Sequence, residues 1–330
     1  MPHPPVDAES AQPHAIEDSA EADAAEAKKC RDLQSAAELG NVAAVRSFLR
    51  TEPEKLEQRK GGGKDTKTSL MLAATNGHVE VVKLLLAAGA RVDATNYTHH
   101  PSVNGAFKTA LHMAAESGHA EVVQLLLAAG AYIDLRDQHG YSALHFAALN
   151  GHVVVAELLL ASGFHVDATT EKDPSRAVME PLTPLYYAAR FGHEAMIELL
   201  LNAGAKIDGP PSAIGVAVDS GHAGVVQQLL TKGATMPRGV LHYAASNGDV
   251  ELVKVLLAAG ASTNARTVEV VKRLLADRYV GSQGPNFSEV LKLLEAAKAR
   301  QDEQSALREA QRKAEEDSRP KRCFGLCPRR

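Results

Sequence analysis

A pair of glycines twelve residues apart recurs six times along the chain, and this repeat constrains the fold more than any other feature. Successive copies are separated by 41, 33, 41, 29 and 27 residues, so every insertion falls between the copies. Variation confined to one place per copy predicts a repeat array whose variable loops lie on one side. The pairs are Gly77 and Gly89, Gly118 and Gly130, Gly151 and Gly163, Gly192 and Gly204, Gly221 and Gly233, and Gly248 and Gly260.

Each copy predicts two short helices followed by an extended finger. In one copy Thr109 has the hydroxyl of an N-cap, and Gly118 ends the first helix in a left-handed conformation. The second helix is expected over Ala120–Ala128, and the strand-like Ala131–Asp134 leads into the linker. Helices of this length are unstable alone in water, so the copies must stack to bury a continuous apolar core.

The first helices carry a recognisable motif. It reads T-A-L-H-M-A-A over Thr109–Ala115, S-A-L-H-F-A-A over Ser142–Ala148, T-P-L-Y-Y-A-A over Thr183–Ala189 and V-L-H-Y-A-A over Val240–Ala245. With the following G-H-x-E-V-V-x-L-L-L-x-x-G-A, it resembles the signature of the ankyrin repeat family over roughly Arg31–Arg266. The resemblance implies an all-α solenoid of helix-turn-helix units with β-hairpin fingers. It also implies reversible protein binding through the fingers and the concave face of the first helices.

The ends of the array depart from the motif. Leu33–Leu49 lacks the T-P-L-H start, and Val268–Ala276 with Ser288–Ala297 resembles a degenerate final helix pair, as expected of terminal caps. The predicted organisation is a disordered acidic arm over 1–28, a solenoid of about seven repeats plus cap helices over 29–297, and a charged helix with a basic, cysteine-containing tail over 298–330.

One internal copy is also irregular. In the copy around Gly221, Gly215 stands where the family has histidine, and Val218 replaces an alanine. Glycine inside a helix is unfavourable, so we expect this first helix to be the weakest point of the stack.

Composition limits the compartment and the class of protein to which this chain can belong. The sequence has no apolar run long enough to cross a bilayer and no signal-peptide core in its first thirty residues. Its three cysteines have no paired spacing inside the repeats, which fits a reducing compartment. These features predict an intracellular, cytoplasmic protein.

The C-terminal tail leaves alternatives open. Cys323 and Cys327 lie beside basic and apolar residues, so S-acylation would give a membrane-associated adaptor with peripheral membrane contact. The same basic stretch also has the composition of a nuclear import signal, and the two cysteines would supply part of a zinc site. An unmodified basic tail explains the residues equally well.

Most histidines are explained by the repeat. Five of them follow the turn glycine and three occupy the first-helix motif, so we expect them to bridge backbone groups rather than to bind a metal. His99 and His100 lie outside the repeat positions. They would bind a metal ion or a partner, or would only be solvated. The eight are His78, His119, His152, His193 and His222 after the glycine, and His112, His145 and His242 in the motif.

No enzymatic motif is apparent. Gly61–Lys64 resembles a phosphate loop, but Gln58 and Asp65 occupy the places where that loop needs Gly and Ser or Thr. Nucleophile elbows, paired catalytic carboxylates and dinucleotide fingerprints are lacking as well. We therefore predict no catalytic residues, no cofactor, no bound metal and no nucleic-acid partner. A role as accessory or regulatory subunit of an enzyme remains an alternative.

Partner-binding residues are expected where the core does not need the side chain. These are the pair before each turn glycine and the residues of the fingers, above all the long fingers Thr95–Lys108 and Thr170–Leu182. Arg190 and Phe191 are the preferred anchors, because arginine and exposed aromatic residues dominate interface energies. The full set is Tyr97, Phe107, Glu116, Arg136, His139, Tyr141, Leu149, Asn150, Arg190 and Phe191, and one or more proteins of unknown identity are the expected partners.

Overall fold

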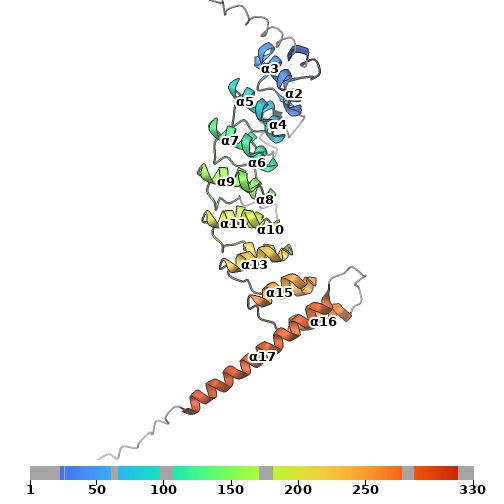
Figure 1. Cartoon of the computed structure of the whole chain (residues 1–330), viewed down its shortest axis with the longest axis vertical. Helices are drawn as coiled ribbons and strands as arrows, with labels where there is room; N and C mark the ends of the chain where they lie inside the picture. The colour runs from blue at the N-terminus through green and yellow to red at the C-terminus, as the bar shows by residue number, and fades with distance from the viewer. Residues whose placement is uncertain are drawn as a thin grey trace, which may run out of the picture. The chain divides into compact units, whose positions relative to one another are not determined.

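The computed structural model describes residues 23–25, 27–60, 66–96, 107–170, 181–276 and 286–318, with side chains up to residue 315. Most of these residues are helical, and short helices follow one another in pairs (Figure 1). The chain divides into two compact units, Met1–Val216 and Ala217–Arg330. We call them the N-terminal unit and the C-terminal unit and describe each by itself.

The described part of the N-terminal unit contains five helix pairs, one for the atypical terminal copy and one for each of the first four glycine-pair copies. First helices pack against first helices of the neighbouring pairs, and second helices pack against second helices. This is the stacking that the repeat predicts. The pairs are α2 (Leu33–Leu39) with α3 (Val42–Thr51), α4 (Ser69–Thr75) with α5 (Val79–Ala87), α6 (Ala110–Ser117) with α7 (Ala120–Ala128), α8 (Ala143–Asn150) with α9 (Val153–Ala161), and α10 (Pro184–Arg190) with α11 (Glu194–Asn202).

The two helices of a pair contribute differently to the core. In α6 the residues from Ala110 to Ala115 are all buried, whereas α7 buries only Val122, Val123 and Leu126. The alanines of the first helices allow close approach to both neighbouring pairs. Each large aliphatic side chain buried in this way contributes about 1.5–3 kcal/mol.

Two of the first helices, α6 and α8, begin at caps that involve the motif histidine. The backbone N–H and the hydroxyl of Thr109 lie 3.2 and 2.9 Å from Nδ1 of His112, and Nε2 of that ring lies 3.1 Å from the carbonyl oxygen of Leu135. Since Nδ1 accepts from the backbone, Nε2 carries the proton and donates to Leu135. His145 makes the same set of contacts with Ser142 and Leu182.

Four of the five turn histidines bridge adjacent pairs, as the sequence predicts. In each case Nε2 lies 3.0 Å from a backbone carbonyl oxygen of the preceding pair. The ring also covers the turn glycine of that pair, which has a left-handed φ of 72° at Gly151. The four partners are Glu38 for His78, Thr75 for His119, Glu116 for His152, and Leu149 for His193.

The predicted strand after each second glycine is wrong in the described residues. Ala131–Asp134 ends in a turn, as do the equivalent segments after Gly89 and Gly163, and none of the equivalent segments in the other copies is a strand. Among the described residues, β1 (Arg59–Lys60) and β2 (Lys67–Thr68) make one two-stranded antiparallel sheet, which follows the 3-10 helix η1 (Pro53–Lys55). The bases of the two long fingers are closed by isolated hydrogen bonds between Asn96 and Lys108 and between Thr170 and Leu182.

The first residues of the N-terminal unit are partly described. Asp23–Ala25 and Ala27 are helical, and the buried carboxylate of Asp23 lies 3.4 Å from the Arg46 guanidinium and 3.3 Å from that of Arg50. Residues 1–22 and 26 of the predicted acidic arm lie outside the described residues.

The C-terminal unit contains the last copies and the cap. Its described helices are α13 (Ala223–Thr231), α14 (Val240–Asn247), α15 (Val250–Ala258), α16 (Ala265–Ala276) and α17 (Phe287–Ser318). The expected cap pair corresponds to α16 and the first third of α17. The expected boundary after residue 297 falls within α17, which is one helix of 32 residues. The helix α12 (Ala213–Asp219) contains the division between the two units.

Candidate functional site

Four aromatic side chains form a continuous row in the N-terminal unit. The ring of Tyr141 lies 5.4 Å from that of Phe146 and 5.3 Å from that of Tyr187, and Tyr187 lies 5.7 Å from Tyr186. The hydroxyls of Tyr141 and Tyr187 also share a hydrogen bond. We call these residues the aromatic row. It connects the finger before α8 with the first helices α8 and α10, so the surface above it has a rigid support.

A lysine and a glutamate stand at one end of the aromatic row. The ammonium of Lys108 lies 4.2 Å from the centroid of the Phe146 ring and 2.7 Å from the carboxylate of Glu116. The lysine therefore makes a cation–π contact and an ion pair at once. Its neighbour in the chain, Phe107, is 42% exposed.

The bases of the two long fingers are closed by backbone hydrogen bonds. Asn96 N–H donates to the Lys108 carbonyl at 3.0 Å, and Lys108 N–H donates to the Asn96 side-chain oxygen at 2.9 Å. Thr170 and Leu182 close the second finger through two bonds of 2.9 Å. The predicted partner residue Tyr97 and the pair His99 and His100 lie outside the described residues.

The preferred anchors lie at the C-terminal end of α10. Arg190 is exposed, and the Phe191 ring is stacked on His193 with their centroids 6.4 Å apart and the ring planes at 24°. Stacking does not hide the phenyl ring, because Phe191 remains 47% exposed. Both residues are therefore accessible on the surface, as the sequence predicts.

The corresponding pair on α8 is less exposed. Leu149 is half-buried and offers its carbonyl to His193, while the exposed Asn150 donates from its side-chain amide to the Phe146 carbonyl at 2.9 Å. Leu149 thus supports the repeat junction and Asn150 contacts the aromatic row, while Asn150 remains exposed.

The finger residues Arg136 and His139 have structural contacts. The Arg136 guanidinium reaches the carbonyls of Gly140 and of Thr169 in the next finger. The His139 ring meets Tyr141 edge-on at 6.4 Å. Arg136 joins two neighbouring fingers, so its role in the structure is to fix their relative position.

The buried histidines below this surface are not suited to acid–base chemistry. Burial lowers the pKa of His112 and of His145 to about 4, against smaller opposing effects of Asp137 on His112 and of the Leu182 carbonyl on His145. Both nitrogens of each ring are occupied by Thr109 and Leu135 or by Ser142 and Leu182. Within the described residues, no group of three His, Cys, Asp or Glu side chains is placed to hold a metal ion.

Comparisons with known proteins agree with this geometry. The family model for ankyrin repeats (3 copies) matches residues 16–96, 96–170, 165–239 and 185–267. The chain belongs to the ankyrin repeat family. The human ASB11 ankyrin repeat domain, known from a crystal structure, is similar with a TM-score of 0.54 and 23% identity, over 69% of this chain and 98% of that one. The search of curated proteins found no match.

Some surface residues of this ankyrin repeat protein escaped the sequence analysis. Lys108, Phe146 and Tyr187 were not among the predicted partner residues, although they complete the surface around Tyr141. A signal was present, because Phe146 and Tyr187 occupy the variable position after the motif histidine or tyrosine. That position is Met113 in the preceding copy and Tyr243 in the last one, so an aromatic residue there distinguishes some copies of the ankyrin stack from others.

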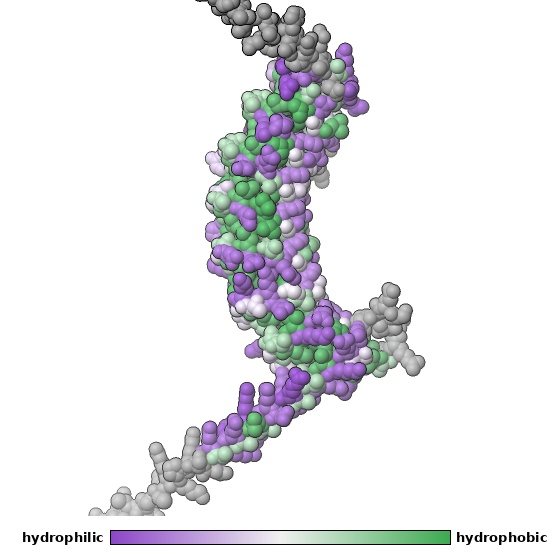
Figure 2. Space-filling view, in the orientation of Figure 1, coloured by the Kyte–Doolittle hydropathy of each residue, from purple (hydrophilic) through white to green (hydrophobic). Residues whose placement is uncertain are grey.

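Figure 2 shows one face of the ankyrin repeat protein, on which patches of hydrophobic residues lie among hydrophilic ones. Large exposed apolar residues in the N-terminal unit include Leu39, Tyr132 and Val154. None of the described helices combines the length and the apolar character that a membrane span requires. Cys323 and Cys327 lie outside the described residues.

Proposed function

We propose that the N-terminal unit binds a protein partner through the surface over the aromatic row, with Phe107 at one finger and Arg190 and Phe191 at the end of α10. Ankyrin repeats are generic protein-protein interaction modules, and the family is typically non-catalytic. The proposal adds to this general role a particular surface and particular anchors.

The observation that carries the proposal is the exposure of two phenylalanines beside a supported surface. Phe107 is 42% and Phe191 is 47% exposed, although each lies next to well-packed residues. Interface anchors are typically large apolar side chains that are exposed to water and held at a rigid position. The rings lose little conformational entropy on binding, because stacking on His193 already restricts Phe191.

The charges around the anchors favour a partner of mixed polarity. Lys108 is neutralised by Glu116 at 2.7 Å and by contact with the Phe146 ring, so it does not make a strongly basic patch. Arg190 adds one cation next to Phe191. A protein segment with an apolar side chain and a nearby hydrogen-bond acceptor fits this arrangement better than a polyanion.

Affinity capture with the full chain tests the surface. The variant Arg190→Glu/Phe191→Ala is expected to lose the partners captured by the wild type, by about 2–4 kcal/mol of binding free energy if both residues are anchors. The matched control is Glu198→Arg/Val154→Ala, which changes an exposed charge and an exposed apolar side chain on second helices. An unchanged set of captured proteins with the first variant would refute the placement of the surface.

The two cysteines of the C-terminal tail support a second proposal, in which S-acylation of Cys323 and Cys327 holds the protein at a membrane. Two acyl chains, or one chain beside basic residues, suffice for stable anchoring. The variant Cys323→Ser/Cys327→Ser is expected to move the protein from the membrane fraction to the soluble fraction. Equal fractionation of variant and wild type contradicts the anchor and leaves the repeat surface unaffected.

A further inference from the structure

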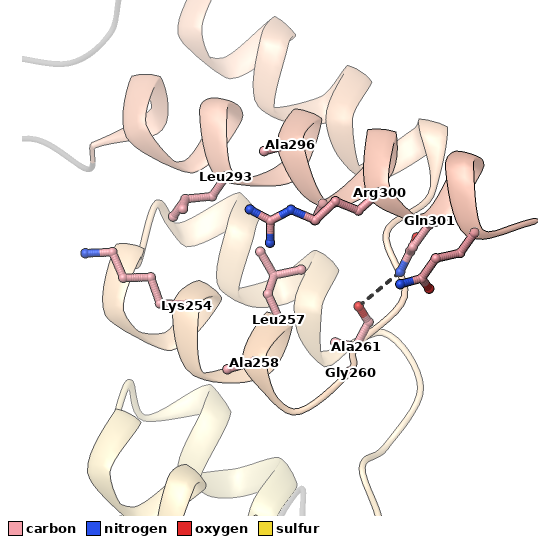
Figure 3. A pocket seen from close by; sticks show the side chains of 11 residues that line it. Lys254, Leu257, Ala258, Gly260, Ala261, Leu293, Ala296, Arg300 and Gln301 are labelled. Carbon is pink, nitrogen blue, oxygen red and sulfur yellow. Dashed lines mark hydrogen bonds between the residues drawn. The ribbon is translucent and has the colours of Figure 1, made fainter.

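A hollow of about 460 Å³ lies on the C-terminal unit between α15 and α17. Its floor is apolar and consists of Leu257 and Ala258 from α15 with Leu293 and Ala296 from α17 (Figure 3). The surface over the aromatic row lies on the other unit and on first helices. This hollow is therefore a separate feature of the molecule.

One cation in the hollow has no carboxylate partner within the described residues. The Arg300 guanidinium extends from α17 over the floor, between Leu293 and Leu257 (Figure 3). Lys254 stands at the opposite end, where it is paired with Glu251 at 2.9 Å and Glu289 at 3.4 Å. The lysine is thus neutralised, and Arg300 is the group available to an incoming anion.

The walls of the hollow are held in place without a ligand. The side-chain oxygen of Gln301 on α17 accepts hydrogen bonds from the Thr263 N–H at 3.2 Å and from its hydroxyl at 2.8 Å. The Gln301 amide also donates to the Ala261 carbonyl at 3.5 Å (Figure 3). A preformed site costs less conformational entropy when it is filled.

A second hollow of about 650 Å³ lies on the other side of α15, against α13. Lys254 and Ala258 line both hollows. The C-terminal half of α15, from Lys254 onward, is therefore flanked by a recess on each side. Two adjoining recesses suit an extended chain or a helix of a partner better than a single small ion.

We propose that the hollow between α15 and α17 binds a short acidic and apolar segment of a partner protein. One apolar side chain of the segment fills the space over Leu257 and Leu293, and a carboxylate within one turn of it pairs with Arg300. Glu251 and Glu289 at the far end repel a polyanion, so a single carboxylate is the matching charge. The inference does not depend on the surface over the aromatic row.

Peptide selection on the intact protein tests this inference. A library of 12-residue peptides displayed on phage is selected on the full chain, and the enriched peptides are measured as synthetic probes. They are expected to carry Asp or Glu within four positions of Leu, Ile, Met or Phe. Arg300→Glu is expected to weaken their binding by about tenfold or more, and replacement of the peptide acid by Lys is expected to restore binding to this variant.

Two further variants separate the charge from the shape of the site. Ala296→Phe fills the hollow without a change of charge and is expected to abolish binding. Lys292→Glu makes a charge reversal on an exposed part of α17 outside the lining and is expected to bind as the wild type does. Circular dichroism melting of each variant shows whether the fold is retained, and Arg300→Gln supplies a milder change if the reversal unfolds the protein.

The following results overturn the proposal. Enriched peptides without acidic residues, or peptides that bind Arg300→Glu and Ala296→Phe as tightly as the wild type, exclude the hollow as their site. Self-association of the wild type in analytical ultracentrifugation that Ala296→Phe abolishes would show that a second copy of the chain, rather than a partner segment, occupies the hollow.

Discussion

The ring of His193 lies directly against the backbone of Gly151 in the preceding helix pair. A β-carbon built on Gly151 would lie 2.7 Å from Nδ1 of that ring, closer than packed atoms approach. The glycine also has a φ of 72°, a conformation that other residues adopt at a cost. This position therefore requires glycine for two independent reasons.

The first prediction is that Gly151→Ala lowers the free energy of unfolding by more than Gly204→Ala does. Gly204 has a φ of 90° but no atom within 4 Å of its built β-carbon, so its variant reports backbone strain alone. We expect the free energy of unfolding to fall by about 1–2 kcal/mol in Gly204→Ala and by at least about 1 kcal/mol more in Gly151→Ala. Urea unfolding followed by circular dichroism measures both, and equal losses would show that the His193 ring moves aside without cost.

The second prediction concerns the coupling between these two residues. His193→Ala alone removes the hydrogen bond from Nε2 to the Leu149 carbonyl, 3.0 Å long, and should cost about 1–3 kcal/mol. In the double variant with Gly151→Ala the close contact is also gone. The combined loss should therefore be smaller than the sum of the single losses, and strict additivity in the double-mutant cycle would argue against direct contact.

The third prediction is a fall in stability at acid pH that originates in the first-helix histidines. Burial lowers the pKa of His112 and His145 to about 4, below the ordinary value of 6.5. The unfolded chain therefore binds a proton at each position as the pH falls through 6.5, whereas the folded chain does so only near 4. The neutral rings therefore make their full contribution to the free energy of unfolding above about pH 6.5. This contribution is lost between that value and about pH 4, and the loss is on the order of 3 kcal/mol for each residue.

Urea midpoints measured across this pH range test the assignment. His145→Gln removes the titrating group, so its midpoint should fall less steeply between pH 6.5 and 4 than that of the wild type. The exposed carboxylates give both proteins a common background slope. Parallel curves for the two proteins would mean that other groups cause the acid sensitivity.

The fourth prediction is a gain of stability from Ser69→Pro. The Ser69 hydroxyl is fully buried without a hydrogen-bond partner, and the residue holds the first position of α4. The preceding Thr68 has a ψ of 163°, which is compatible with a following proline, and the Thr183–Pro184 pair already starts α10 in this way. We expect a gain of about 1 kcal/mol in thermal or urea unfolding. Ser69→Ala measures the contribution of the hydroxyl alone, and a lower melting temperature for the proline variant would contradict the argument.

The fifth prediction concerns the end of the folded C-terminal unit. A chain ending after Ala297 lacks Gln301 and its bonds to Thr263, whereas a chain ending after Gln311 keeps them. The shorter chain should melt at a lower temperature than the longer one, since α17 holds the Thr263 loop only beyond residue 297. Equal melting temperatures would place the end of the folded unit at the boundary that the sequence suggests.

The sequence predicts the local fold well where a residue type has one backbone role. Glycines at the turns and the hydroxyls of Thr109 and Ser142 at helix starts mark positions with strong local preferences, and the structure confirms them. The predicted strand at Ala131–Asp134 is wrong because alternating apolar residues are also compatible with an extended turn, and strand formation depends on the partner segment.

The surface was harder to predict, because it depends on contacts between copies. The sequence predicts a partner contact for Tyr141 but not the packing of its ring on Phe146 and Tyr187, which lie 5 and 46 residues away in the chain. Arg300 likewise looks like one charge among many in the sequence of α17. Only the packing of that helix on α15 shows that it overlies an apolar floor.

The junctions between helix pairs have a consequence for how such a surface can diversify. Each histidine is bound by a carbonyl oxygen of the main chain, contributed by Glu38, Thr75, Glu116 or Leu149. The side chains at this position are two glutamates, a threonine and a leucine, which differ in charge, size and polarity, while the 3.0 Å bond is the same in all four. Assembly thus uses main-chain atoms at these positions, so a change of side chain there need not loosen the stack.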